Sequence, residues 1–295
     1  MQIPGVLEAR LRLQLEGEYD EFAEACSRPP RTSYRVNTLK ASIDDVTSVF
    51  DSEPVPWSHT GFYTEARVGD SIEHFQGLLY VQESASMLAA EVLDPVECDC
   101  VLDLTAAPGS KTTQMAAMMK NEGCIVANEL DSQRLKTLRF NLNRMGVVNT
   151  VVSNVDGARF RSKMRFDRVL LDAPCSNLGQ LRENPEALKS WSEGNVRRCA
   201  GVQRKLMDVA ASFLKKDGVL VYSTCTFSPE ENEAVVDHAI RKHGLSCEGI
   251  GGEFKSRNGL LEWKGKRYGP EVENSVRIYP HENDTGGFFA AKLRR

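Results

Sequence analysis

The sequence lacks long apolar segments. No stretch of the 295 residues approaches the roughly 18 consecutive apolar residues that a membrane-spanning helix needs. The first residues, "MQIPGVLEARLRLQLEGEYDEF", carry charges throughout and contain no apolar core of secretory length. We therefore expect a cytoplasmic protein without membrane contact, or a nuclear one if the source is eukaryotic.

The sequence also lacks the cysteine spacing of a metal site or a disulfide framework. Of the eight cysteines only Cys98 and Cys100 are close together, and no second Cys pair or His pair completes a ligand set. We expect no metal and mostly free thiols, as in other proteins of a reducing compartment. A free cysteine is most often a small buried apolar residue.

Internal repeats, low-complexity tracts and the two common glycine motifs for nucleotides are absent as well. In "DLTAAPGSKT" the residue before Lys111 is Ser110, which excludes a P-loop, and the dinucleotide G-x-G-x-x-G does not occur. This small-residue turn still lets a ligand approach the backbone, and the helix expected after it favours a carboxylate or phosphate at its N-terminus.

What is present is an ordinary globular composition, 41% hydrophobic and 26% charged, in a chain long enough for one large and one small domain. From residue 94 onward apolar strands alternate with helices, which predicts a mostly parallel sheet covered on both faces. The tail "NSVRIYPHENDTGGFFAAKLRR" predicts two antiparallel strands at its edge. We predict an α/β catalytic domain at 94–295 and a smaller α+β domain at 1–93.

Acidic residues end four successive strands of this pattern: Asp103, Glu129, Asp156 and Asp172. Glu129 comes 20 residues after Gly109, a position that suits a ribose diol. Together the four acids favour a neutral or cationic nucleoside such as S-adenosylmethionine and would repel a nucleoside triphosphate. Helix capping explains one or two of them equally well.

Two cysteines follow strands directly. Cys175 lies in "VLLDAPCSN" and Cys225 in "VYSTCTFSPEENE", the kind of turn where open α/β sheets place reactive groups. Ser228, Pro229 and Glu231 form a capping-box pattern, which predicts a helix start just beyond Cys225. The two cysteines either fill space in the core or take part in a reaction.

Basic residues are unevenly distributed although the net charge is −4. The segment "SRPPRTSYRVNTLK" carries Arg28, Arg31, Arg35 and Lys40 without an acid, and residues 131–168 hold nine Arg or Lys against three Asp. Local basic surfaces bind phosphates even on an acidic protein. Composition alone is equally consistent with solvated helix faces.

Three motifs, "DLTAAPGSKT", "LLDAPCS" and "YSTCTFSPEENEAV", resemble those of the Nop/Sun (RsmB-like) RNA cytosine-5 methyltransferases. The likeness extends to "SYRVNTLK", "LLYVQESASMLAA" and "RIYPHENDTGGFFAAKL", and so covers the chain from about residue 20 to its end. The resemblance implies a Rossmann-like class I methyltransferase sheet, with a smaller N-terminal RNA-binding domain.

By that resemblance S-adenosyl-L-methionine is the cofactor, Cys225 the nucleophile, Cys175 the residue that assists product release, and Asp172 a group between cofactor and cytosine. Glu129 would bind the ribose and Asp156 the adenine. The remaining predicted cofactor contacts are Thr105, Ala106, Ala107, Pro108, Gly109, Ser110, Lys111 and Arg134.

Two departures from the family pattern concern small loops. Thr105 and Ser110 replace a Cys and a Gly of the family's first motif, and both keep the turn small. After "DAPCS" the family usually continues with two glycines, whereas this chain has Asn177 and Leu178. We expect this difference to affect the loop near the target base.

The resemblance predicts a monomeric RNA (cytosine-5-)-methyltransferase that acts on tRNA or rRNA with its target base flipped out of the stack. Arg28, Arg31 and Arg35 are the expected phosphate contacts. We slightly favour tRNA, because no further RNA-binding domain follows "AAKLRR". A DNA cytosine-5 methyltransferase and a catalytically silent RNA-binding factor are the alternative readings.

Overall fold

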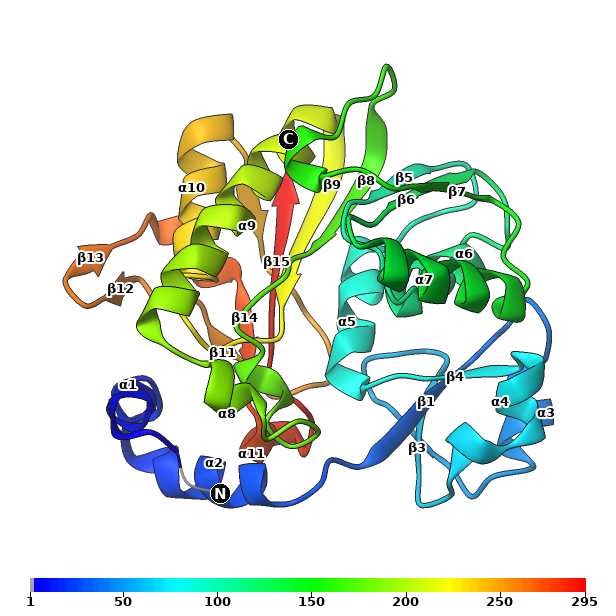
Figure 1. The fold of residues 1–295 in the computed structure, drawn as a ribbon, viewed down its shortest axis with the longest axis horizontal. Helices are drawn as coiled ribbons and strands as arrows, with labels where there is room; N and C mark the ends of the chain where they lie inside the picture. The colour runs from blue at the N-terminus through cyan, green and yellow to red at the C-terminus, as the bar shows by residue number, and fades with distance from the viewer. Residues whose placement is uncertain (1–2) are drawn as a thin grey trace.

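The computed structural model describes residues 3–295, and within them a nine-stranded mixed sheet forms the centre of the molecule (Figure 1). Its strands occur in the order β11-β14-β15-β9-β8-β5-β6-β7, with β10 pairing to β15. The strand bounds are β5 (Cys100–Asp103), β6 (Cys124–Asn128), β7 (Thr150–Ser153), β8 (Phe166–Asp172), β9 (Leu214–Thr224), β10 (Ser246–Glu248), β11 (Arg257–Asn258), β14 (Val276–Ile278) and β15 (Phe288–Arg294).

Strands β7, β6, β5, β8 and β9 pair in parallel, whereas β15 pairs antiparallel with β9 and β14. The predicted parallel sheet with an antiparallel C-terminal edge is thus confirmed. The chain runs outward from β5 to β7 and then returns to the other side of β5 with β8. The carboxyl ends of β5 and β8 therefore flank a topological switch point, where open α/β sheets bind ligands.

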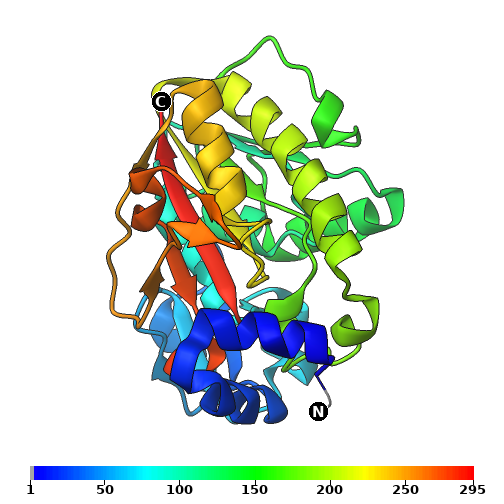
Figure 2. The ribbon, with the colours of Figure 1, turned by 90° about the vertical axis from the view of Figure 1, so that its left-hand side faces the viewer.

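Side chains of alternate strand residues are buried in two separate hydrophobic cores, one on each face of the sheet. Val101 packs on the face covered by α5 (Ser84–Leu93) and α6 (Ser110–Met118), and Leu102 packs on the opposite face. That second face is covered by α9 (Glu193–Phe213) and α10 (Glu233–His243), which lie side by side in Figure 2. Helix α7 (Ser132–Met145) packs beside α6 over the loop at Ala106 and Ala107.

The N-terminal part does not pack as one unit. A separate four-stranded sheet of order β2-β3-β1-β4 has its own small core around Tyr34 and Phe62. Its elements are β1 (Thr32–Val36), α3 (Ile43–Thr47), β2 (Glu53–Pro54), β3 (Gly61–Thr64), α4 (Ile72–Gln76) and β4 (Leu79–Val81). Helices α1 (Gly5–Leu15) and α2 (Tyr19–Ser27) instead pack against Phe227 and Tyr279 of the C-terminal half, and Figure 1 places α2 close to α11 (Pro280–Asn283).

The expected boundary at 93/94 differs from this arrangement. Helix α5 lies on its N-terminal side, yet Leu88 and Leu93 are buried in the core of the large sheet. The small-sheet unit therefore ends before Ser84. Helix α5 also contacts β3 of the small sheet, so it lies between the two sheets, and packing rather than sequence pattern determines its position.

The helix predicted to begin at Pro229 begins instead at Glu233. Residues 229–232 form turns in which the Glu231 amide donates to the Ser228 carbonyl, and the Glu231 side chain turns away to other partners. The remaining elements are short: η1 (Glu16–Glu18), η2 (Val68–Asp70), η3 (Gly157–Arg159), η4 (Leu178–Gln180), α8 (Ala187–Ser190), β12 (Glu262–Trp263), β13 (Lys266–Arg267) and η5 (Pro270–Asn274). Over residues 3–295, every helix is too short or too polar to cross a bilayer.

Candidate active site

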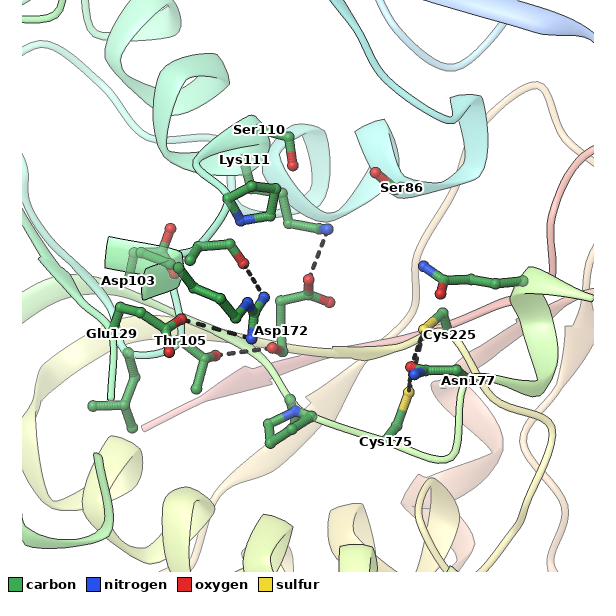
Figure 3. Close-up of a pocket in the computed structure, with 18 of the residues that line it drawn as sticks. Ser86, Asp103, Thr105, Ser110, Lys111, Glu129, Asp172, Cys175, Asn177 and Cys225 are labelled. Atoms are coloured by element: carbon green, nitrogen blue, oxygen red, sulfur yellow. Dashed lines mark hydrogen bonds and ion pairs between the residues drawn. The ribbon is translucent and has the colours of Figure 1, made fainter. Parts of the chain in front are cut away.

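A cavity of about 740 Å³ opens at the switch point between β5 and β8. Its walls come from the loops after β5, β6, β7, β8 and β9, together with Glu83 before α5 and the segment before β15. Figure 3 shows the predicted cofactor loop at one side and the two thiols at the other. This volume is typical of a small-molecule site.

The loop after β5 wraps around the cavity as the small residues predicted. Gly109 has a φ of +105°, and a Cβ at this position would lie 2.9 Å from Leu138 of α7. Only glycine accepts both the dihedral and the close approach. The loop is fastened by α7, because Asn141 donates to the Pro108 carbonyl at 2.9 Å and Arg134 to the Ala107 carbonyl at 2.5 Å.

The strand-end acids all line this cavity, as expected from parallel strands. Asp103 is 1% exposed, and its Oδ2 accepts a hydrogen bond from Thr112 at 2.7 Å. Its Oδ1 has no partner among the described residues. Burial raises the pKa of Asp103 to about 7. Because Oδ1 is unpaired and the residue lines the cavity, this oxygen is available to a donor from a bound ligand.

Glu129 and Asp156 also make local bonds. Glu129 is buried and accepts from the Asp131 amide at 2.8 Å, while Arg134 lies 3.8 Å from its other oxygen. Asp156 caps η3 by accepting from the Ala158 amide at 3.0 Å. Local bonds of the capping kind thus use one oxygen of each carboxylate. Both residues still border the cavity.

Asp172 stands at the centre of the site. Lys111 lies 2.7 Å from its Oδ2, and Thr105 donates to its backbone carbonyl at 2.9 Å (Figure 3). Ser223 donates to its Oδ1 at 2.8 Å. Burial opposes the charge of Lys111, but the attraction of Asp172 outweighs it and raises the pKa of this lysine. The raised pKa keeps Lys111 an ammonium, and its pair with Asp172 lies between the cofactor loop and the thiols.

The two thiols are brought together by the loops after β8 and β9. The Sγ atoms of Cys175 and Cys225 are 3.2 Å apart, and all eight cysteines of the chain are free. The hydrogen bond with Cys225, reinforced by burial, raises the pKa of Cys175 well above its usual range. Either thiol can be the donor in this contact. Neither side chain is part of the hydrophobic cores.

Asn177 is a site residue whose contact the sequence did not predict. Its Oδ1 lies 3.3 Å from the Sγ of Cys225 and 3.4 Å from that of Cys175, and its φ is +58°. Asparagine tolerates this left-handed conformation, which explains how it replaces a glycine. Leu178 is 2% exposed and packs in the α1–α2 core.

A buried carboxylate holds both thiol loops. Glu231 is fully buried and accepts from the amide of Ser176 at 2.9 Å, from its hydroxyl at 2.5 Å, and from Gln203 of α9 at 3.1 Å. Thr226 shares the Ser176 hydroxyl at 2.8 Å. Burial raises the pKa of Glu231, although these hydrogen bonds oppose the shift. The loop of Cys175 is thereby tied to the loop of Cys225.

The predicted helix N-terminus beside Cys225 is wrong. Because α10 begins at Glu233, eight residues farther on, its N-terminus does not adjoin this thiol. The groups that face Cys225 are Cys175 and Asn177, with the charge of Lys111 within electrostatic reach. Asp172, Cys175 and Cys225 do meet in one cavity, as the sequence predicted.

The three arginines expected to contact RNA differ in position. Arg28 is largely exposed, and Arg31 is partly exposed, pairing with Glu53 at 2.6 Å. Arg35 is fully buried and donates to Thr113 of α6 at 2.9 Å, so its predicted phosphate contact is corrected to a structural role between the small sheet and α6.

Comparisons with known proteins show the family of this chain. Residues 90–294 match the family described as 16S rRNA methyltransferase RsmB/F, and residues 3–84 match the N-terminal domain of 16S rRNA methyltransferase RsmF. A tRNA (cytosine(49)-C(5))-methyltransferase of Pyrococcus abyssi is 43% identical, over 94% of this chain and 92% of that protein. Ribosomal RNA small subunit methyltransferase F of Vibrio parahaemolyticus is 42% identical, but the chain spans only 62% of its length.

Solved structures show the same fold over nearly the whole chain. A methyltransferase homolog protein from Pyrococcus horikoshii has a TM-score of 0.82 at 33% identity, covering 95% of this chain and 91% of its own. NSun6 from Pyrococcus horikoshii with SFG has a TM-score of 0.86 at 26% identity, covering 99% and 98%. The chain therefore belongs to the RsmB/F family of 16S rRNA methyltransferases, and is an S-adenosylmethionine-dependent RNA methyltransferase.

Proposed function

We propose that this methyltransferase forms 5-methylcytosine in tRNA through a covalent bond between Cys225 and carbon 6 of the target cytosine. The observation that carries the proposal is the pair of thiols 3.2 Å apart in the cavity that also holds the cofactor loop and Asp172. A thiol that only packed would have no reason to border the same cavity as a second one.

The cavity residues fit S-adenosylmethionine. The unpartnered Oδ1 of Asp103 offers an acceptor, and Glu129 and Asp156 border the space with further carboxylates. This acidic wall suits a ligand with positive charge and a ribose diol. Thr105 to Lys111 would hold the methionine end, Glu129 the ribose and Asp156 the adenine. When bound, the cofactor supplies an electrophilic methyl group.

The chain's own groups then have distinct tasks. Carbon 5 of cytosine becomes nucleophilic once the thiolate of Cys225 adds to carbon 6, because the ring is converted to an enamine. Asp172, adjoining both loops, accepts a hydrogen bond from the exocyclic amine, and the ammonium of Lys111, 2.7 Å from its Oδ2, stabilises negative charge that develops on the ring. After methylation a base removes the carbon 5 proton, the electron pair re-forms the double bond, and the bond from Cys225 to carbon 6 breaks. Cys175 is placed to return a proton to the departing sulfur.

The choice of tRNA rests on the comparison with the Pyrococcus abyssi enzyme, which this chain matches along 92% of that protein. A target base must leave its stack to reach the cavity, so a loop or an opened stem is the expected site. Bisulfite sequencing of tRNA and rRNA incubated with the protein and cofactor distinguishes the two substrates. A mark confined to rRNA would overturn the tRNA assignment.

The nucleophile is tested with alanine variants of the two thiols. Cys225→Ala should neither methylate nor cross-link to RNA, because it cannot form the carbon 6 bond. Cys175→Ala should still attack but release slowly, so a protein–RNA adduct should accumulate on a denaturing gel. The double variant should lose the adduct, and Cys98→Ala, an exposed cysteine elsewhere, should behave as the native chain. An adduct with Cys225→Ala alone would assign the nucleophile to Cys175.

A further inference from the structure

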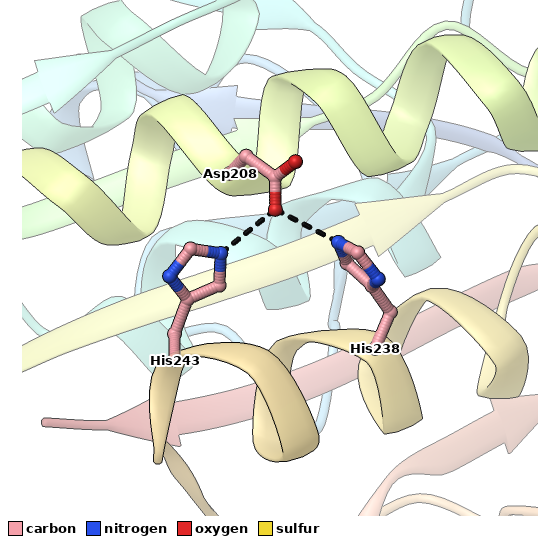
Figure 4. A group of neighbouring side chains, drawn as sticks. All are labelled: Asp208, His238 and His243. Atoms are coloured by element: carbon pink, nitrogen blue, oxygen red, sulfur yellow. Dashed lines mark hydrogen bonds and ion pairs between the residues drawn. The ribbon is translucent and has the colours of Figure 1, made fainter.

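A cluster of potential metal ligands lies away from the cavity, between α9 and α10. Asp208 comes from α9, and His238 and His243 come from α10 (Figure 4). Both imidazole rings turn toward the same carboxylate oxygen. The Nε2 of His238 is 2.8 Å from Asp208 Oδ1 and that of His243 is 2.7 Å from it.

The cluster is partly open to solvent. The side chains of Asp208, His238 and His243 are 30%, 25% and 20% exposed. The three ligand atoms lie within 4.8 Å of one another. An ion could therefore enter from solvent, bind all three atoms and keep water at its remaining positions.

The helices that carry the ligands are anchored in the core beside them. Met207 beside Asp208 and Ala239 beside His238 are fully buried in the core under the two helices. Binding would require rotation of the side chains and no rearrangement of the helices, because a divalent ion separates neighbouring ligand atoms by about 3 Å.

Among residues 3–295, Lys242 is the other charged group paired with this cluster. Its Nζ lies 2.8 Å from Asp208 Oδ2, the oxygen that the histidines do not share, and its side chain is 53% exposed. A ligating carboxylate commonly has its second oxygen held by an outer hydrogen bond. Lys242 can keep that contact while Oδ1 binds an ion.

A second cluster shows the contrast. Glu18, His281 and Glu282 are equally close, but Arg257 already binds both carboxylates, at 2.5 and 2.8 Å. A guanidinium thus occupies the position that an ion would need. No comparable cation lies between Asp208 Oδ1 and its two histidines within the described residues.

We propose that Asp208, His238 and His243 form a binding site for a divalent transition-metal ion such as Zn²⁺. Two neutral imidazoles and one carboxylate are a donor set that suits zinc, nickel and cobalt rather than magnesium or calcium. The ion would cross-link α9 and α10. Helix α9 carries Gln203, which donates to Glu231, and α10 follows the Cys225 loop. The metal site would therefore stabilise two helices that support the active site.

The test is titration of the metal-free full-length protein with ZnCl₂, followed by calorimetry and by thermal unfolding. At a hundredfold excess of free zinc over Kd, the native chain should gain about 4 °C in Tm. His238→Ala and His243→Ala should each lose this gain, and the double variant should lose no more than either single one. Affinity should fall on acidification, because imidazole binds metal only when neutral.

Exposed cysteines and the active-site thiols also bind zinc, so the decisive quantity is the difference between variants. His59→Ala removes an exposed histidine elsewhere and should leave the gain intact. Lys242→Ala keeps all three ligands and should weaken zinc binding about tenfold or more without abolishing it, which separates ligation from simple stability of α10. Equal zinc titrations for the native chain and His243→Ala would overturn the site, as would loss of binding in Lys242→Ala.

Discussion

Glu129 shows how one side chain serves the fold and the site together. Its Oε1 accepts from the Asp131 amide at the start of α7, and its other oxygen lies 3.8 Å from Arg134 at the cavity. A pure capping role and a ribose-binding role make different demands. The first needs only an acceptor, and the second needs a carboxylate that can take two hydroxyl donors.

Replacing Glu129 with Ala should weaken cofactor binding without unfolding the protein. Hydrogen bonds to a charged group are worth on the order of 1.5–3 kcal/mol, so affinity for S-adenosylhomocysteine should fall about tenfold or more. Calorimetry measures this directly. Glu122→Ala is the matched control, because Glu122 is exposed before the opposite end of β6. An unchanged affinity for S-adenosylhomocysteine in Glu129→Ala would show that Glu129 only caps the helix and does not bind the ribose.

At the scale of elements, the active site depends on three segments that Glu231 joins. The carboxylate links the loop after β8, through Ser176, to α9, through Gln203, while its own backbone follows β9. Gly179 adds a close contact, since its amide donates to the Cys225 carbonyl at 2.8 Å and a Cβ there would lie 2.1 Å from the Gly287 carbonyl. The thiol separation is therefore set by buried contacts behind the cavity.

Glu231→Gln should slow adduct formation while leaving cofactor affinity unchanged. The amide keeps the size of the side chain but loses the charge that binds two donors of Ser176, and a loop displaced by about 1 Å can cost about a hundredfold in rate. Single-turnover adduct formation and S-adenosylhomocysteine calorimetry measure the two effects separately. Glu230→Gln is the neighbouring control, because Glu230 bonds Arg10 and Trp263 instead. Equal adduct rates in the two variants would exclude this positioning role.

For the whole molecule, the exposed basic residues matter through their distribution and not through the net charge of −4. Several arginines of the basic segment 131–168 are used internally, as when Arg168 pairs with Asp99 at 3.0 Å. Arg28 and Arg31 remain partly open to solvent beside the small sheet. Phosphate contacts there would add salt-dependent affinity without sequence preference.

Arg28→Ala and Arg31→Ala should each reduce the slope of log affinity for tRNA against log salt by about 1. Arg35→Ala should leave this slope unchanged and instead lower the free energy of unfolding, since it removes a buried side chain that bonds Thr113 and Gln82. Binding measured across a salt series, together with urea unfolding, distinguishes the two classes. A slope altered only by Arg35→Ala would contradict the assignment.

The sequence by itself determined the features that depend on local pattern. The alternation of strands and helices predicts the parallel sheet, and parallel strands bring their carboxyl ends to one edge, so Asp103, Asp172, Cys175 and Cys225 could be expected in one site. Turn chemistry around Gly109 predicts a loop that a ligand can approach. Each of these inferences needs only neighbouring residues and a sheet whose strands run in the same direction.

Tertiary structure alone decided which polar side chains meet. Ser176 and Glu231 are 55 residues apart, and Asp208 and His238 are 30 apart, so no local spacing predicts either contact. The same holds for Arg35, which reads as a surface cation but is enclosed when the small sheet packs on α6. The physical reason is that burial and partner choice follow from how whole elements pack, which residue periodicity does not encode.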